Sequence, residues 1–494
     1  MMRSVIPFAA LVAVATVAAA APTSVATTTT TGTTTTGTTT TPAPPEPTRV
    51  PPAKSPIASI QDDRLSYSTI SADLRVRQMV ELGSRLIRTD LPWDYVAKTR
   101  PTDPKDQNDP AYDWTRMDQI VAAANKYKVK ILFTVWGTPI WAKDPKVTDS
   151  PFWERAIRPA NPAEFGDFAI AAATRYAPRG VHLWEAWNEP NIPLFLVPQF
   201  ERKAGKWVNV SAKTYSALAK SFWTGVKAVD PTAQIAGLVT APVGETCPAF
   251  CPDSANDRTY PLEFLKILDA PGLRPPMDAV SHHPYPQSGP RGYDFPGAGY
   301  VDLYNLSRLE KAVDASYLKG KPLWLTEVGF STAFTRNYST YFSKAKQAEY
   351  LADAYRRVRE NPRIKVLTWF FLQDNREWTS GLLTIKGAKK PAYGAFAFPV
   401  SPDIRKTGPA GTPITILGQI RIAAAAGPVT IQREVSRVWK NLAVVKTTTD
   451  GGFSAVVRPT ETARYRATWS GRSRFRAKEV RVSEPFTLRV LRGS

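Results

Sequence analysis

The feature that most constrains the fold is an alternation of short apolar runs with amphipathic segments between Ile57 and Pro399. The runs expected to form strands are 57–60, 84–88, 129–135, 181–187, 234–239, 279–282, 323–326 and 366–371. The segments between them place apolar residues at i, i+3 and i+4, which predicts helices. The expected helices are 72–82, 114–127, 164–176, 212–229, 262–268, 304–317 and 345–359. Eight strands alternating with seven helices over roughly 340 residues predict a (β/α)8 TIM barrel spanning 56–399.

The barrel has one competitor among strand–helix folds, an open doubly wound sheet. Such a sheet usually carries a Gly-rich phosphate-binding turn, and the sequence has none. In a barrel, the catalytic groups lie at the carboxyl ends of the strands. We therefore expect functional residues directly after the predicted strands.

The first 55 residues differ in composition from the barrel. Residues 1–26 are typical of a secretory signal peptide: Arg3 gives a positive start, an apolar run follows, and Ala20/Ala21 or Ala26 are candidate cleavage points. Residues 27–55 are rich in Thr and then Pro, which predicts a disordered linker. No later run reaches the length of about 18 apolar residues that spans a membrane. We therefore expect a secreted, extracellular protein without a transmembrane segment, with cell-surface association as an alternative.

After Pro399 the helical pattern stops. Short strand candidates follow at 415–420, 429–433, 442–447, 453–457, 463–469 and 486–490, and turn signals such as Asp450-Gly451-Gly452 separate them. This pattern predicts a small all-β sandwich domain over 400–494. The stretch from Arg464 to Trp469 resembles the immunoglobulin-like modules appended to secreted bacterial proteins.

The formal net charge of +21 suggests an acidic partner. The basic residues are scattered and form no recognisable nucleic-acid motif, so we expect no nucleic-acid partner. They are densest near the carboxyl terminus, where a contact with anionic cell-surface polymers is the alternative to a simple solvated surface. These residues are Arg464, Arg466, Arg472, Arg474, Arg476, Lys478 and Arg481.

The chain has only two cysteines, Cys247 and Cys251, and only three histidines. In an oxidising compartment the two cysteines are expected to form a small disulfide loop. The cysteines and histidines do not have the spacing of a metal site, so we expect neither a metal nor an organic cofactor.

Two glutamates occupy unusual positions. Glu189 follows the fourth predicted strand directly before Pro190, which cannot donate to a strand ladder, and Glu327 ends the seventh. Strands four and seven are three apart in a ring of eight, so the two carboxyl groups would face each other across one mouth. A protonated and an ionised carboxyl group facing each other are what glycosidic bond cleavage requires.

The motifs Trp187-Asn188-Glu189-Pro190-Asn191 and Leu325-Thr326-Glu327-Val328-Gly329 resemble those of the retaining glycoside hydrolases of clan A, the cellulase-like and β-xylosidase-like barrels of families 5 and 39. The resemblance covers about residues 57–398. It implies that Glu189 is the general acid/base and Glu327 the nucleophile. It also implies that Asn188 hydrogen-bonds the sugar 2-hydroxyl.

The same resemblance implies further substrate-binding residues at other strand ends. Arg88 would keep the nucleophile ionised, Tyr285 would hydrogen-bond it, and Trp369 would floor the subsite of the cleaved sugar. Spacing to the tyrosine favours His283 over His282 as the subsite residue, although adjacent strand residues face opposite ways. Trp136 is expected to extend the sugar platform, while His182 is expected to be a core residue.

These observations predict a secreted retaining O-glycosyl hydrolase that acts on an oligo- or polysaccharide. The two carboxyl groups should lie about 5–5.5 Å apart. The pKa of Glu189 should be raised and that of Glu327 lowered. The alternative is a non-catalytic glycan- or cell-envelope-binding protein, and transglycosylation in the same site is also left open.

Overall fold

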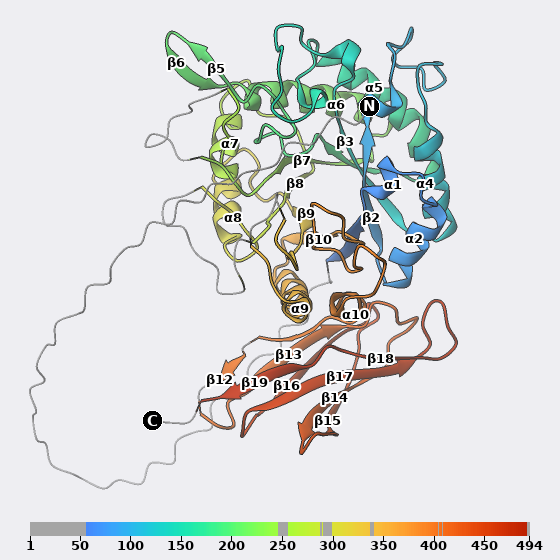
Figure 1. The fold of residues 1–494 in the computed structure, drawn as a ribbon, viewed down its shortest axis with the longest axis vertical. Coiled ribbons are helices and arrows are strands. Elements are labelled where there is room, and N and C mark those ends of the chain that lie inside the picture. Colours follow the sequence, from blue (N-terminus) through green and yellow to red (C-terminus); the bar gives the residue numbers. More distant parts are fainter. Residues whose placement is uncertain are drawn as a thin grey trace, which may run out of the picture.

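The computed structural model describes residues 56–491 except 246–254, 287–288, 290–298, 336–339, 404 and 408. Eight parallel strands close into a barrel with helices around it, and an antiparallel β region follows (Figure 1). The barrel strands are β1 (Ile57–Gln61), β2 (Leu86–Pro92), β3 (Lys130–Trp136), β4 (Leu183–Ala186), β7 (Gln234–Thr240), β8 (Ala279–His282), β9 (Leu323–Val328) and β10 (Ile364–Phe370). The predicted TIM barrel followed by a β domain is confirmed. The predicted signal peptide, the linker and the Cys247–Cys251 pair lie outside the described residues.

The helices cover the outer wall of the barrel. They are α1 (Arg64–Tyr67), α2 (Ala72–Glu81), α3 (Trp93–Val96), α4 (Thr115–Lys126), α5 (Ala163–Tyr176), α6 (Ser211–Val229), α7 (Pro261–Leu268), α8 (Ser307–Asp314), α9 (Lys344–Glu360) and α10 (Pro391–Ala397). Among the described helices, none is long and apolar enough to cross a bilayer.

The barrel interior is closed by an apolar layer near the amino ends of the strands. Six strands each contribute one buried side chain to this layer. They are Leu86, Leu132, Ala236, Ala279, Trp324 and Val366. Because the strands are buried on both faces, their sequences are continuous apolar runs rather than alternating ones. This layer seals one end, so polar side chains further along the strands face the other end.

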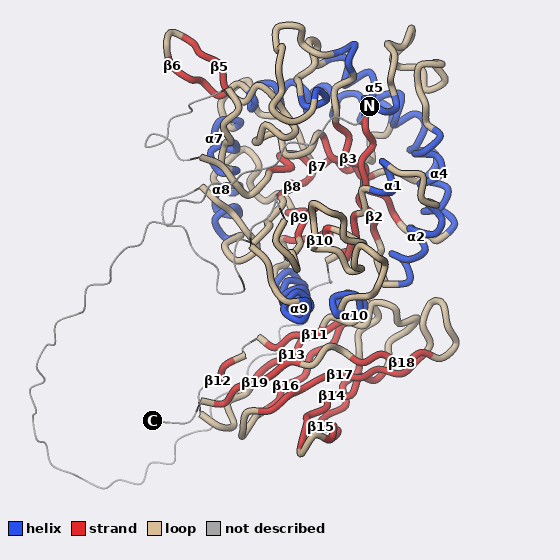
Figure 2. The backbone as a smooth tube through the Cα atoms, viewed as in Figure 1, coloured by secondary structure: helices blue, strands red, loops and turns tan. Residues whose placement is uncertain are grey.

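The long segment after β4 contains a hairpin that was not predicted from its sequence. Its sequence predicts a loop over 198–210, but β5 (Phe200–Lys203) and β6 (Lys206–Asn209) form an antiparallel hairpin there. Ala204 and Gly205 form its turn with φ of 48° and 81°. Positive φ at both turn residues is the geometry of two-residue hairpins. The hairpin projects beyond the barrel, as Figure 2 shows.

The β domain consists of two sheets. The first sheet contains three strands: β11 (Val400–Pro402), β13 (Ile414–Gln419) and β16 (Gly452–Val457). The second sheet contains, in order, β12 (Lys406–Thr407), β19 (Phe486–Val490), β17 (Ala463–Gly471), β14 (Pro428–Val435) and β15 (Val438–Lys446). A further strand of this sheet, β18 (Glu479–Val482), pairs with β17. Alternation of buried and exposed residues in β13, β16 and β17 produces the shared core. The short strands β11, β12 and β18 were not predicted.

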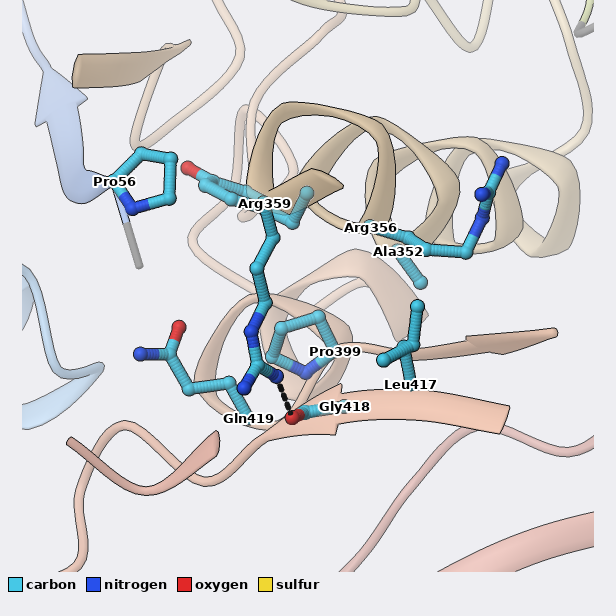
Figure 3. Close-up of a pocket in the computed structure, with 9 residues that line it drawn as sticks. Pro56, Ala352, Arg356, Arg359, Pro399, Leu417, Gly418 and Gln419 are labelled. Carbon is cyan, nitrogen blue, oxygen red and sulfur yellow. Dashed lines mark hydrogen bonds between the residues drawn. The ribbon is translucent and has the colours of Figure 1, made fainter. Parts of the chain in front are cut away.

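The barrel and the β domain are joined by two buried arginines. The Arg421 guanidinium lies 3.7 Å from the ring centroid of Tyr355 and 4.5 Å from that of Phe396. Arg359 of α9 donates from Nη1 to the Gly418 carbonyl at 2.6 Å, beside a small cavity between the two parts (Figure 3). Gly83, just before β2, lies against Arg421: a Cβ there would come within 2.5 Å of the Arg421 Cβ. The β domain is therefore packed against the outer face of the barrel, on α9 and α10 (Figure 1).

Candidate active site

The two predicted glutamates meet at the carboxyl ends of the barrel strands. Glu189 lies three residues beyond the end of β4, and Glu327 is the penultimate residue of β9. Both are buried, with exposed fractions of 8% and 7%. Their nearest carboxylate oxygens lie within 4.8 Å of each other and of a ring nitrogen of His283. Strands four and seven of the barrel thus bring together two residues that are 138 positions apart in the chain.

The backbone that carries Glu189 is strained. Trp187 has a φ of 72° and Glu189 a φ of 37°, in the left-handed region that non-glycine residues rarely adopt. The neighbouring strand β7 has the same feature at Leu238 and Val239, with φ of 66° and 45°. The Glu189 N–H donates to the Val239 carbonyl at 2.9 Å. This hydrogen bond links the two strained segments and stabilises their conformations.

Glu327 accepts hydrogen bonds that Glu189 does not. The Tyr285 hydroxyl donates to its Oε2 at 2.7 Å, and Arg88 Nη1 donates to its Oε1. Arg88 belongs to β2 and has no exposed surface. Charge-assisted hydrogen bonds stabilise the ionised form of a carboxyl group. Glu327 is therefore the member of the pair that the surroundings favour as a carboxylate.

The pKa values of the pair agree with prediction for only one residue. Burial, and next the negative charge of Glu327, raise the pKa of Glu189 well above its usual range. The predicted lowering for Glu327 is wrong: burial raises its pKa too, and outweighs Arg88 and the Tyr285 hydrogen bond. The free energy lost when the Glu327 carboxylate is removed from water is larger than the stabilisation that Arg88 provides. Glu189 still has the stronger upward shift, so it holds a proton more tightly than Glu327.

His283 donates to Glu189. Its Nδ1 lies 2.7 Å from Glu189 Oε1, and its Nε2 lies 3.4 Å from Arg88 Nη2. A guanidinium only donates, so Nε2 must accept and Nδ1 must carry the proton. Burial, and next the positive charge of Arg88, hold the pKa of His283 well below its usual value, so the ring is neutral.

The structure also decides between the two adjacent histidines. His282 Nε2 lies 3.0 Å from the Val301 carbonyl and its Nδ1 lies 2.9 Å from Thr240 Oγ1, away from the glutamates. The prediction that His182 is a core residue is wrong. It is exposed at the amino end of β4 and pairs with Asp230. His182 directly precedes β4, so its side chain lies at the amino-terminal end of the barrel, where it reaches solvent.

Arg88 is the centre of a larger network. Beyond Glu327, its Nη2 donates to Asn188 Oδ1 at 2.9 Å and its Nε to Glu185 Oε2 at 2.6 Å. Glu185 is fully buried and was not predicted as a site residue. It lies inside the run 181–187, whose apolar character hid the one carboxyl group within it. One signal could have identified Glu185. It lies four residues before Glu189, and residues separated by an even number of positions on a strand face the same side.

The two predicted tryptophans lie in different surroundings. The Trp136 indole donates to Asp90 Oδ2 at 2.8 Å, and the Arg155 guanidinium lies 3.9 Å from its ring centroid. Trp369 has no exposed surface, and its indole donates to the Ser380 carbonyl at 2.9 Å. A ring with no exposed face is not in position to stack on a sugar. The structure therefore does not support the predicted subsite role of Trp369.

Aromatic and acidic side chains that the sequence did not single out surround the glutamates. Phe370, the residue after Trp369, clusters with Tyr285 and Trp378. On the side of β1 and β2, Tyr67 donates to Asp90 at 2.6 Å. Asp63 lies beside them, and burial, with Asp90 and Glu327 nearby, raises its pKa to about 8. This wall therefore places hydroxyl and carboxyl groups beside the two glutamates.

The donor set fits proton transfer better than cation binding. Glu189, His283 and Glu327 are the one group among the described residues whose ligand atoms approach closely enough to hold a metal ion. However, the His283 nitrogen that faces the carboxyl groups carries a proton and has no lone pair to offer. The oxygens of Glu327 already accept from Arg88 and Tyr285. These contacts indicate acid–base chemistry between two carboxyl groups.

Comparison with known proteins shows similarity of fold only. No family model matches the chain, and no curated protein matches it. Among solved structures, a glucosidase from Croceicoccus marinus is 15% identical, with a TM-score of 0.49, over 82% of this chain and 94% of that one. A family 30 endoxylanase from Clostridium papyrosolvens is 13% identical, with a TM-score of 0.41, over 83% and 95% of the two chains. A family 44 xyloglucanase from Paenibacillus polymyxa is 12% identical, with a TM-score of 0.41, over 84% and 96%.

Proposed function

We propose that the chain is a secreted retaining O-glycosyl hydrolase of a poly- or oligosaccharide. One observation carries the proposal: two buried glutamates approach within 4.8 Å at the mouth of the barrel, and only Glu327 is bonded to Arg88 and Tyr285. This closeness supports retention, because inverting enzymes need about 6.5–9.5 Å between the carboxyl groups to admit a water. The two motifs support a place in clan A, with families 5 and 39 as the proposed relatives.

The mechanism follows from the unequal surroundings of the two glutamates. Glu327, as the carboxylate, attacks the anomeric carbon while Glu189 gives its proton to the leaving oxygen. His283 donates to Glu189 Oε1, which leaves the acidic proton on Oε2. Glu189, now ionised, then takes a proton from water, which attacks the anomeric carbon and releases Glu327. Asn188, held by Arg88, is proposed to meet the sugar 2-hydroxyl.

The stereochemistry of the product tests this proposal. Proton NMR of a fresh digest should show the sugar first released with the anomeric configuration of the substrate, because two displacements at one carbon restore it. A panel of aryl β-glycosides and polysaccharides supplies the substrates. A first-formed product of opposite configuration would remove Glu327 from the role of nucleophile, and no turnover on any substrate would favour a glycan-binding protein.

The proposed secretion rests on residues 1–26 and 27–55 alone. Expression of the full chain in a secreting bacterial host should release a mature protein whose amino terminus lies near residue 21 or 27, as Edman sequencing would show. Retention of the intact chain inside the cell would contradict the proposal.

We also propose that the β domain contacts anionic cell-surface polysaccharides. The segment between β17 and β18 reads Arg472-Ser473-Arg474-Phe475-Arg476-Ala477-Lys478, without any acidic residue. Its four cationic side chains are exposed, and Phe475 is 42% exposed. Clustered positive charge beside an exposed aromatic ring suits an acidic polymer. The segment belongs to the β domain, which packs on the outer helices α9 and α10, so such a contact would leave the proposed catalytic site open.

Replacing the four cations of this segment by Gln should weaken binding to an acidic polysaccharide at least about tenfold at low ionic strength, because the contact is electrostatic. Affinity electrophoresis in gels containing alginate measures the effect. The matched control replaces Lys440 and Lys446, exposed cations of β15, and should retain binding. Equal retention by both variants would contradict the proposed contact.

A further inference from the structure

Glu185 is a buried carboxylate that the mechanism above does not use. It belongs to β4, and its Oε2 accepts hydrogen bonds from Arg88 Nε and Thr134 Oγ1, both at 2.6 Å. Its Oε1 accepts from Ser281 Oγ at 2.7 Å. These partners come from three other strands, so the side chain points into the barrel. A buried carboxylate is costly unless it is paired, and Arg88 is the cation that pairs with it.

Arg88 lies between two carboxyl groups. Its Nε faces Glu185 and its Nη1 faces Glu327, and both ion pairs are buried. A guanidinium carries a single positive charge, so the two carboxyl groups must share it. Burial raises the pKa of Glu327, and Arg88 opposes this shift while it also pairs with Glu185.

We propose that Glu185 is a positioning residue for the reaction: it fixes the orientation of Arg88 and withdraws part of its positive charge from Glu327. Its catalytic meaning rests on the proposed glycosidase function, whereas the coupling of the two charges is a property of the fold. A carboxylate that is held less tightly by its cation is a stronger nucleophile. Glu185 therefore sets how reactive Glu327 is without touching the substrate.

Other groups near Glu327 also act on its ionisation. The charged and titratable side chains that face it are Asp63 after β1, Arg88 and Asp90 in β2, Glu189 after β4, and His283 and Tyr285 after β8. Around Glu185 they are Arg88 and Tyr215. All of them are retained when Glu185 alone is replaced, so a change in Glu327 reports the charge at position 185.

Carbon NMR of the full chain, labelled with 13C at the glutamate carboxyl groups, measures the ionisation of Glu327 directly. Glu185→Gln should lower its titration midpoint by about one pH unit, because Arg88 then pairs with Glu327 alone. The acid limb of kcat/KM should move in the same direction. The matched control is Asp353→Asn, which removes a buried carboxylate between Arg356 and Arg357 on the outer helix α9 and should move neither.

An unchanged midpoint in Glu185→Gln, or an equal shift in Asp353→Asn, overturns the proposal. If Glu185→Gln does not fold, Thr134→Val takes its place with the opposite sign. Losing that donor makes Glu185 depend more on Arg88, so the Glu327 midpoint should rise, and no rise overturns the proposal. The titration needs no substrate: a shift without turnover removes only the glycosidase function, and turnover without a shift removes only the role of Glu185.

Discussion

Glu327→Ala should lower kcat on aryl glycosides by at least about 10⁴-fold, because it removes the atom that forms the covalent intermediate. The chain should still fold, since Arg88 keeps Glu185 as its partner. A small nucleophile such as azide should restore turnover by attacking the anomeric carbon from the vacated side. The product would then be a glycosyl azide of inverted configuration.

Steady-state kinetics, with NMR of the azide product, checks this result. Glu263→Ala, which changes an exposed carboxylate on α7, is the control and should retain full activity. Full activity in Glu327→Ala would end the two-glutamate mechanism. A loss that azide does not reverse, in a chain with unchanged circular dichroism, would place the nucleophile elsewhere.

Glu189→Gln should have an effect that depends on the leaving group. With a poor leaving group, kcat/KM should fall about 10³-fold, because no acid protonates the departing oxygen. With 2,4-dinitrophenolate, which needs no proton, the first step should be nearly unchanged. Measurement of kcat/KM over a series of phenol leaving groups tests this, and equal losses across the series would contradict the acid role.

The pH dependence of the wild type has a defined sign. Glu189 must be protonated and Glu327 ionised, so activity should fall as pH rises through the raised pKa of Glu189 and as pH falls through that of Glu327. Glu189→Gln should lack the alkaline fall. Folding stability follows the same logic: an acid whose pKa is raised by folding loses stabilising effect as pH rises, so the Tm of this variant should decline less towards alkaline pH than that of the wild type.

The barrel was predictable because each parallel strand is buried on both faces and so appears as an apolar run. Glu189 and Glu327 stood out because each interrupts the end of such a run. The raised pKa of Glu189 was predictable from its expected role as the acid. The direction of the pKa shift of Glu327 was not predictable. That direction depends on how far burial outweighs the hydrogen bonds from Arg88 and Tyr285, which only the folded structure shows.

Other features depend on geometry that no local pattern encodes. Trp369 and Phe370 are adjacent aromatic residues, and which one faces the mouth is decided by the path of the chain at the end of β10. His282 and His283 pose the same choice. The β5–β6 hairpin lacks the alternation that marks a strand, because it projects from the barrel and buries little on either face.

The paired strain at the ends of β4 and β7 has a consequence for engineering this chain. Four non-glycine residues there adopt backbone conformations that each cost about 1–3 kcal/mol. A search for thermostable variants would be drawn to these positions, since glycine or asparagine relieves such strain most cheaply. Glycine, however, also makes the backbone more flexible, which weakens the hold of the Val239 carbonyl on the Glu189 N–H and so the positioning of the proton donor. Selection for heat resistance and selection for turnover therefore pull in opposite directions at Leu238 and Val239.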